Sequence, residues 1–123
     1  MTPVSYVGDL EHDLQTIRMW AANGRRATAQ WMRGYDSART AQRAVAESLL
    51  EMRRICLEIE KLDRVEISIL VWEAILVTDH LHHALGSEDG HIIHAADELL
   101  AQRELAIWGA VEVIKLLHAS AAA

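Results

Sequence analysis

The sequence is poor in the residues that break helices or cross-link small folds. Its 123 residues include one proline, no phenylalanine and one cysteine, Cys56. A lone cysteine excludes an internal disulfide, so the sequence predicts a reducing, cytoplasmic setting. No apolar run reaches the about 20 residues of a membrane span. The first residues lack a basic segment followed by an apolar one, so we expect no secretory signal.

The residues that are abundant favour helices joined by short turns. The chain is 51% hydrophobic and rich in Ala, Leu, Glu, Arg and Ile, which is typical of helical proteins. We therefore predict an all-α protein, a small antiparallel bundle of about four helices in a single domain over residues 1–123.

Helix-start and helix-stop signals divide the chain into segments. Thr2 before Pro3 and Asp63 before Glu66 are start signals. Glycines predict the stops, at Asn23-Gly24, at a bend near Gly34 and at Gly86. The expected helices are a first one ending near residue 24, a weakly defined segment at 25–35, and longer helices at 36–62, 64–85 and 90–118.

The stretch at 64–85 is apolar on nearly all sides. Placed at about 100° per residue, Ile69 and Leu76 fall on one broad stripe, whereas Val71 and Ile75 lie nearly opposite. Such a helix is either central in its fold or covered by another chain.

A second apolar stripe on each of two helices predicts a contact with another protein, because one small bundle has only one core to fill. Large aromatic residues are also enriched at protein contacts. The predicted contact residues are Val71, Trp72, Ile75, Leu105, Trp108 and Leu116. We therefore expect a homodimer, because a symmetric two-fold contact is the commonest way to bury such a surface.

Two opposite charges interrupt the apolar arcs of the last two helices. Folding these helices as a hairpin brings Glu73 level with Arg103. We predict a buried structural ion pair that fixes the register of the hairpin, because an unpaired buried charge costs several kcal/mol.

Histidines and acids gather where the third long helix ends and the fourth begins. The histidines are His80, His82, His83, His91 and His94. A metal-dependent helical-bundle enzyme that uses the His80–Glu98 region is therefore one alternative. However, His82 and His83 point in different directions on a helix, and no HExxH or paired Glu-x-x-His motif is present. We expect no metal and no cofactor.

Charge is unevenly distributed over the chain. The net charge is −6, yet six arginines in the Arg18–Arg43 segment face a single acid, Asp36. A nucleic-acid binder is therefore a second alternative. The acidic balance of the whole chain argues against it, because DNA would repel such a protein.

The reading that remains is an interaction protein without enzymatic activity. Cys56 lies on an inward stripe with no histidine expected beside it, so we predict a core thiol rather than a nucleophile. We expect a small cytoplasmic regulator or inhibitor that binds and masks another protein, such as a transcription factor or an enzyme. This expectation comes from elimination, because a helical bundle does not by itself imply a function.

Overall fold

Four helices account for almost all of the computed structural model, which describes residues 3–62 and 64–122. They are α1 (Pro3–Met32), α2 (Ala38–Glu60), α3 (Val65–Ser87) and α4 (Gly90–Ala122). The all-α prediction is confirmed. Thr2 and Asp63, two of the predicted start signals, lie outside the described residues. Over the part of the chain that is described, none of the helices is long and apolar enough to cross a membrane.

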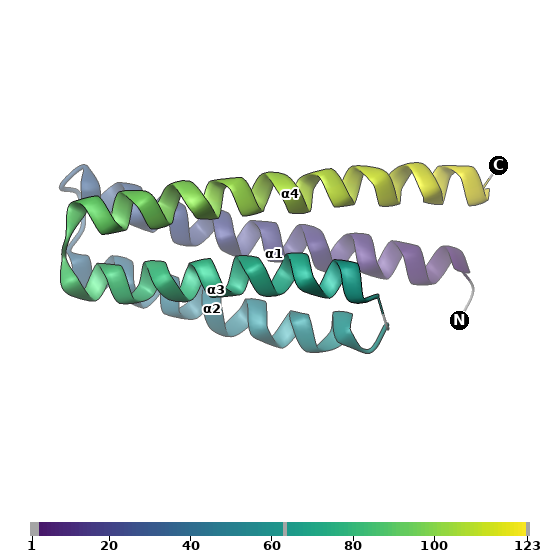
Figure 1. Ribbon diagram of the computed structural model, residues 1–123, viewed down its shortest axis with the longest axis horizontal. Helices are drawn as coiled ribbons and strands as arrows, with labels where there is room; N and C mark the ends of the chain where they lie inside the picture. Colours follow the sequence, from purple (N-terminus) through teal and green to yellow (C-terminus); the bar gives the residue numbers. More distant parts are fainter. Residues whose placement is uncertain (1–2, 63, 123) are drawn as a thin grey trace.

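The helices form an antiparallel bundle in which each packs against the next along the chain and α4 returns to α1 (Figure 1). α1 and α3 therefore occupy diagonal corners. The chain between α2 and α3 is short, and α1 and α4 both extend past it, so the two ends of the chain lie at the same end of the bundle. The core is built from leucine, isoleucine and valine on all four helices, with Leu14, Val45, Ile75 and Ile107 almost completely buried.

The predicted break at Asn23-Gly24 is wrong, because α1 continues through it without interruption. Gly24 is buried, and a Cβ placed there would lie 3.5 Å from side-chain atoms of Val45 and Ser48 on α2. The glycine thus sits where α1 and α2 approach closely, and packing along a long helix outweighs its propensity cost of about 1 kcal/mol. The chain reverses instead at Gly34, whose φ of +81° suits a residue without a side chain.

The orientation of α3 is the reverse of the one expected from its apolar stripe. Val71 and Ile75 are buried in the core, whereas Ile69 and Leu76 are about half exposed. The buried positions recur through Ala74, Thr78 and Leu81 at helical spacing. Both faces of this helix are apolar, so periodicity alone does not say which of them faces the core.

The end of α3 also differs from the prediction. The helix passes Gly86 and ends at Ser87, and Glu88 takes the left-handed position with φ 56°. That backbone conformation costs a residue with a Cβ roughly 1–2 kcal/mol.

We expect Glu88→Gly to raise the free energy of unfolding by about 1 kcal/mol, because glycine removes the Cβ clash. Glu88→Ala is the control, since it removes the charge and keeps the Cβ. Urea unfolding measures both changes. An equal gain in the two variants would mean that the charge, and not the backbone conformation, was responsible.

Candidate protein-contact surface

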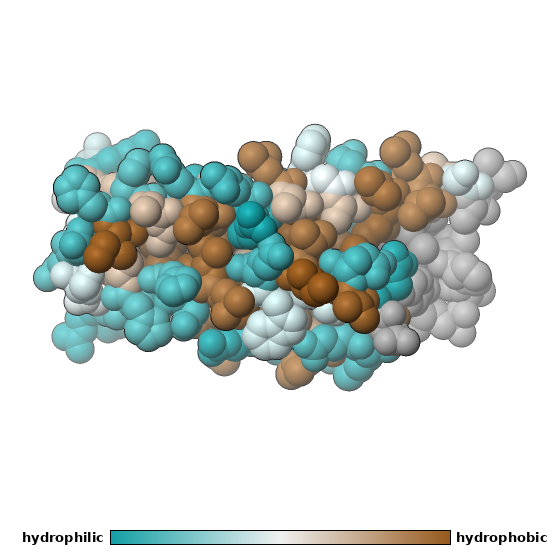
Figure 2. All heavy atoms as spheres, viewed as in Figure 1, coloured by the Kyte–Doolittle hydropathy of each residue, from teal (hydrophilic) through white to brown (hydrophobic). Residues whose placement is uncertain are grey.

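A broad apolar surface lies on the outside of α3 and α4. We call it the α3–α4 face and define it by Ile69, Trp72 and Leu76 of α3, Ile92 and Leu99 of α4, and the pair Glu73 and Arg103 between them. Each of the five apolar side chains is 43–57% exposed. Figure 2 shows brown, hydrophobic side chains gathered over these two helices, with hydrophilic ones in the middle.

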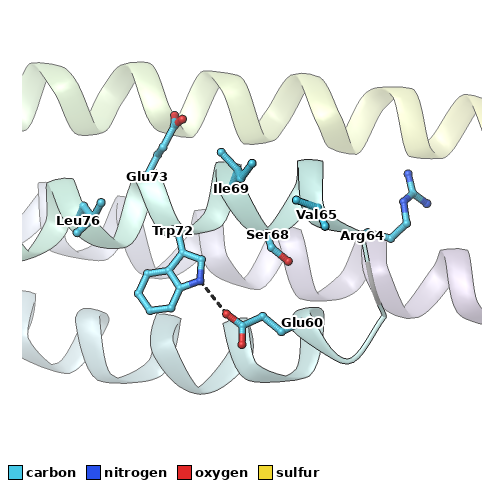
Figure 3. A pocket seen from close by; sticks show the side chains of 8 residues that line it. All are labelled: Glu60, Arg64, Val65, Ser68, Ile69, Trp72, Glu73 and Leu76. Carbon is cyan, nitrogen blue, oxygen red and sulfur yellow. Dashed lines mark hydrogen bonds between the residues drawn. The ribbon is translucent and has the colours of Figure 1, made fainter.

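Three neighbouring hollows make this face a continuous groove. The first, of about 430 Å³, lies along the first half of α3 and includes Ile69, Trp72 and Leu76 (Figure 3). The second, of about 390 Å³, shares Leu76 with the first and reaches Leu99 on α4. The third, of about 240 Å³, shares Leu99 with the second and ends at Ile92. Because consecutive hollows share side chains, they form one groove that begins on the α2 side of α3 and reaches the α3–α4 seam at Leu99.

Trp72 forms the edge of the groove toward α2. Its indole N–H donates a 2.7 Å hydrogen bond to Glu60 Oε1, and the ring lies across the gap between the two helices (Figure 3). The bond satisfies the one polar group of the side chain while 43% of Trp72 stays exposed. The ring is therefore held in one orientation with an apolar surface open to solvent.

Glu73 and Arg103 form the ion pair expected from the hairpin register, with Arg103 Nη1 donating to Glu73 Oε2. The pair is not buried, which corrects the sequence prediction. The Glu73 side chain is 41% exposed and that of Arg103 is 32% exposed. Both sit on the flanks of their helices, where solvent screens the interaction and reduces its contribution to stability to about 1 kcal/mol or less.

Comparison with known protein families, curated protein sequences and solved structures finds no match.

The six contact residues expected from the sequence do not lie on one surface. Val71 and Ile75 belong to the core, so neither is available to another chain, and Trp72 belongs to the α3–α4 face. Leu105, Trp108 and Leu116 are exposed. At 100° per residue, however, they project on the other side of α4 from Leu99 and Arg103. The contact residues predicted from the sequence do not include Ile69, Leu76, Ile92 and Leu99, because Ile69 and Leu76 lie on the broader stripe of their helix, and Ile92 and Leu99 lie on the apolar side of the last helix, which was expected to face the core.

The histidine-rich region is divided among several environments. His80 lines the groove beside Leu99, and His94 pairs with Glu98 on the same helix at 3.1 Å. The Asp97 carboxylate forms an ion pair with Arg25 of α1.

One group of possible ligands does converge among the described residues, namely Asp79, His82 and His83. This corrects the expectation that His82 and His83 diverge. His83 Nδ1 lies 2.8 Å from the backbone oxygen of Asp79, and the Asp79 carboxylate lies 4.0 Å from Arg53. Contacts within the protein therefore already engage Asp79 and His83, and the absence of a bound metal stays a prediction.

The arginine-rich segment does not form a single basic stripe. Arg25 turns inward between α1 and α4, where it bonds Asp97 at 3.1 Å and Glu104 at 2.8 Å. Arg26 is exposed and bonds Asn23, whereas Arg39 and Arg43 lie on α2. Arg39 and Arg43 line one hollow on α2 together. The expectation that nucleic acid is not a partner stays a prediction.

Cys56 is a core thiol held against a carboxylate. It is 1% exposed, and its Sγ donates to Glu60 Oε1 at 3.8 Å. Burial, together with the negative charge of Glu60, raises the pKa of the thiol from 9.0 to about 11. Burial and a raised pKa are the opposite of what a nucleophilic cysteine requires.

We expect iodoacetamide to alkylate native Cys56 at pH 8 about 100-fold more slowly than the unfolded chain, because two pKa units lower the thiolate fraction about 100-fold. The same shift makes stability depend on pH. Since the folded pKa is raised, the stabilisation is complete below about pH 9 and is lost as the pH rises toward about 11. Mass spectrometry of timed aliquots measures the rate, and equal rates for native and unfolded protein would contradict the assignment.

Proposed function

We propose that this chain is a protein–protein interaction module that binds its partner through the α3–α4 face. The single observation that supports the proposal best is the apolar groove between Ile69 and Ile92, whose hollows share side chains and contain the Glu73–Arg103 pair. A surface that covers part of a partner can mask that part, so we propose the role of a regulator or inhibitor that does not catalyse a reaction. The buried free thiol of Cys56 is compatible with a reducing, cytoplasmic setting, which belongs to the same proposal.

Energetics supports this use of the face. Full burial of an exposed leucine or isoleucine gains about 1.5–3 kcal/mol, and Ile69, Leu76 and Leu99 are each only about half buried by their own chain. A partner that covers the exposed parts of these three side chains would therefore gain several kcal/mol of binding free energy from their burial. Surfaces of this kind, with a rim of polar side chains, are typical of protein contacts.

Features inside the groove would give the contact specificity. Glu73 and Arg103 present one charge of each sign at its centre. The fixed indole of Trp72 offers a large apolar surface that loses little conformational freedom on binding. An apolar cluster around a few oriented polar groups is how a protein contact selects its partner.

The native mass of the protein in an extract of the cells that make it tests this proposal. We expect wild type to migrate well above its own 13.8 kDa, and Leu76→Glu combined with Leu99→Glu to migrate at the monomer mass. Met19→Glu is the matched control, because Met19 is also about half exposed but lies on α1, diagonally opposite α3. The proposal fails if wild type runs as a monomer, or if the control loses mass as the double variant does.

A further inference from the structure

We propose that the first occupant of the α3–α4 face is a second copy of this chain, packed so that α3 of each copy lies on α4 of the other. The inference rests on the proposed function, since it names the partner of the same face. It is carried by three properties of the groove, namely its charges, the sizes of its side chains and its dimensions.

The ion pair fixes which residues of the two helices are level. α3 and α4 are antiparallel, and Glu73 contacts Arg103 directly. Moving from this pair toward the start of α3 brings Ile69 level with Ala106, and moving the other way brings Ala84 level with Ile92. His80 and Ala96, which line the same hollow, agree with this register.

The central charges make the face complementary to itself. Each copy brings one carboxylate and one guanidinium, about one third to two fifths exposed. A two-fold axis parallel to the helices places Glu73 of each copy over Arg103 of the other, so four charges alternate in sign around a square. An axis across the helices would instead set Glu73 against Glu73, which is unfavourable. The charges therefore select the arrangement in which α3 packs on α4.

Side-chain sizes follow the same pairing. Toward the start of α3, the large Ile69 is level with the small Ala106 of α4. Placing α3 over α4 of a second copy thus sets a large side chain against a small one at that end, as interdigitated helix packing requires. At the other end, Ala84 is level with Ile92 but is buried in the core of its own bundle, so the size argument applies to the first end alone.

The dimensions of the face suit a stable dimer. A helix of the length of α3 is about 35 Å long, and two adjacent helices are about 20 Å wide, which gives a footprint of about 700 Å². A standard interface buries about 800 Å² on each partner. Such an area is roughly one tenth of the 7144 Å² surface of the chain.

Exchanging the central charges tests the contact in purified protein. We expect Glu73→Arg alone and Arg103→Glu alone each to weaken the dimer at least about 100-fold, because each places four like charges together. An equimolar mixture of the two variants should form a 1:1 heterodimer, since one copy is then doubly positive and the other doubly negative. Sedimentation equilibrium measures all three samples, and circular dichroism checks that each variant stays helical. If a charge variant loses helicity, Leu76→Glu replaces it as the variant that must dissociate.

Disulfide trapping tests the pairing of α3 with α4. Ile69→Cys protein mixed with Ala106→Cys protein should form a disulfide-linked dimer on mild oxidation, whereas neither protein alone should do so. Cross-linking of Ile69→Cys with itself would overturn the arrangement. A monomeric wild type at about 100 μM would overturn the dimer altogether. The proposed function would still hold in that case if the protein from cells migrates above the monomer mass with another polypeptide.

Discussion

Replacing Ile75 with glutamate is expected to unfold the bundle, whereas the same change at the next residue, Leu76, should leave it folded. Ile75 is 1% exposed and Leu76 is 57% exposed. A charge at the buried position costs several kcal/mol in addition to the lost burial of isoleucine, about 1.5–3 kcal/mol. Together these losses approach the total stability of a small domain, about 5–15 kcal/mol.

Circular dichroism and thermal melting separate the two outcomes. Ile75→Glu should lose its cooperative transition, and Leu76→Glu should melt within a few degrees of the wild-type monomer. The opposite result, a folded Ile75→Glu and an unfolded Leu76→Glu, would mean that α3 is rotated by about half a turn from the orientation described here. It would also restore Val71 and Ile75 as candidates for a contact with another protein.

Arg25→Ala is the second change for which we expect a large effect, a loss of about 2–3 kcal/mol in the free energy of unfolding. The guanidinium joins α1 to α4 through Asp97 and Glu104, whose side chains are only 21% and 15% exposed. Removing the guanidinium leaves two partly buried carboxylates without a cation. The free-energy cost of such an uncompensated charge is larger than the net stabilisation that the ion pair provides.

Arg26→Ala is the matched control for this change. Arg26 is the next residue along α1, is exposed, and bonds Asn23 within its own helix. Its removal should cost less than about 0.5 kcal/mol. Urea unfolding measures both variants. Equal effects at the two positions would show that the contacts of Arg25 with α4 contribute nothing beyond a surface charge.

Much of the fold follows from the sequence for identifiable reasons. α2, α3 and α4 begin and end within a few residues of their expected bounds, because turn and cap residues separate three long stretches of helix-forming residues. Ser37 illustrates this, since its hydroxyl accepts the Thr40 N–H at the start of α2. The bounds of α1 were predicted less well. Glycine is typical of a helix end, but Gly24 lies inside α1, where the lack of a side chain allows α1 to pack closely against α2.

The surface was harder to predict than the fold. In α2, charged side chains mark the outside, whereas α3 has apolar residues on both sides, so its burial is decided by the neighbouring helices. The register of the α3–α4 hairpin did place Glu73 beside Arg103, since both residues are defined by their distance from one turn. Their exposure depends on the rotation of α3 and α4 about their own axes. The helical period of apolar residues does not define that rotation closely enough to predict whether the two side chains are buried.

Photo-cross-linking from single positions tests most directly whether the α3–α4 face is where this protein meets another. A photoreactive phenylalanine analogue would replace Leu76 in one protein and Met19 in another, and each would be irradiated in the cells that make it. We expect an adduct with a second polypeptide from position 76 and none from position 19, because only the first lies in the groove. An adduct from position 19 with none from position 76 would contradict the assignment of the face.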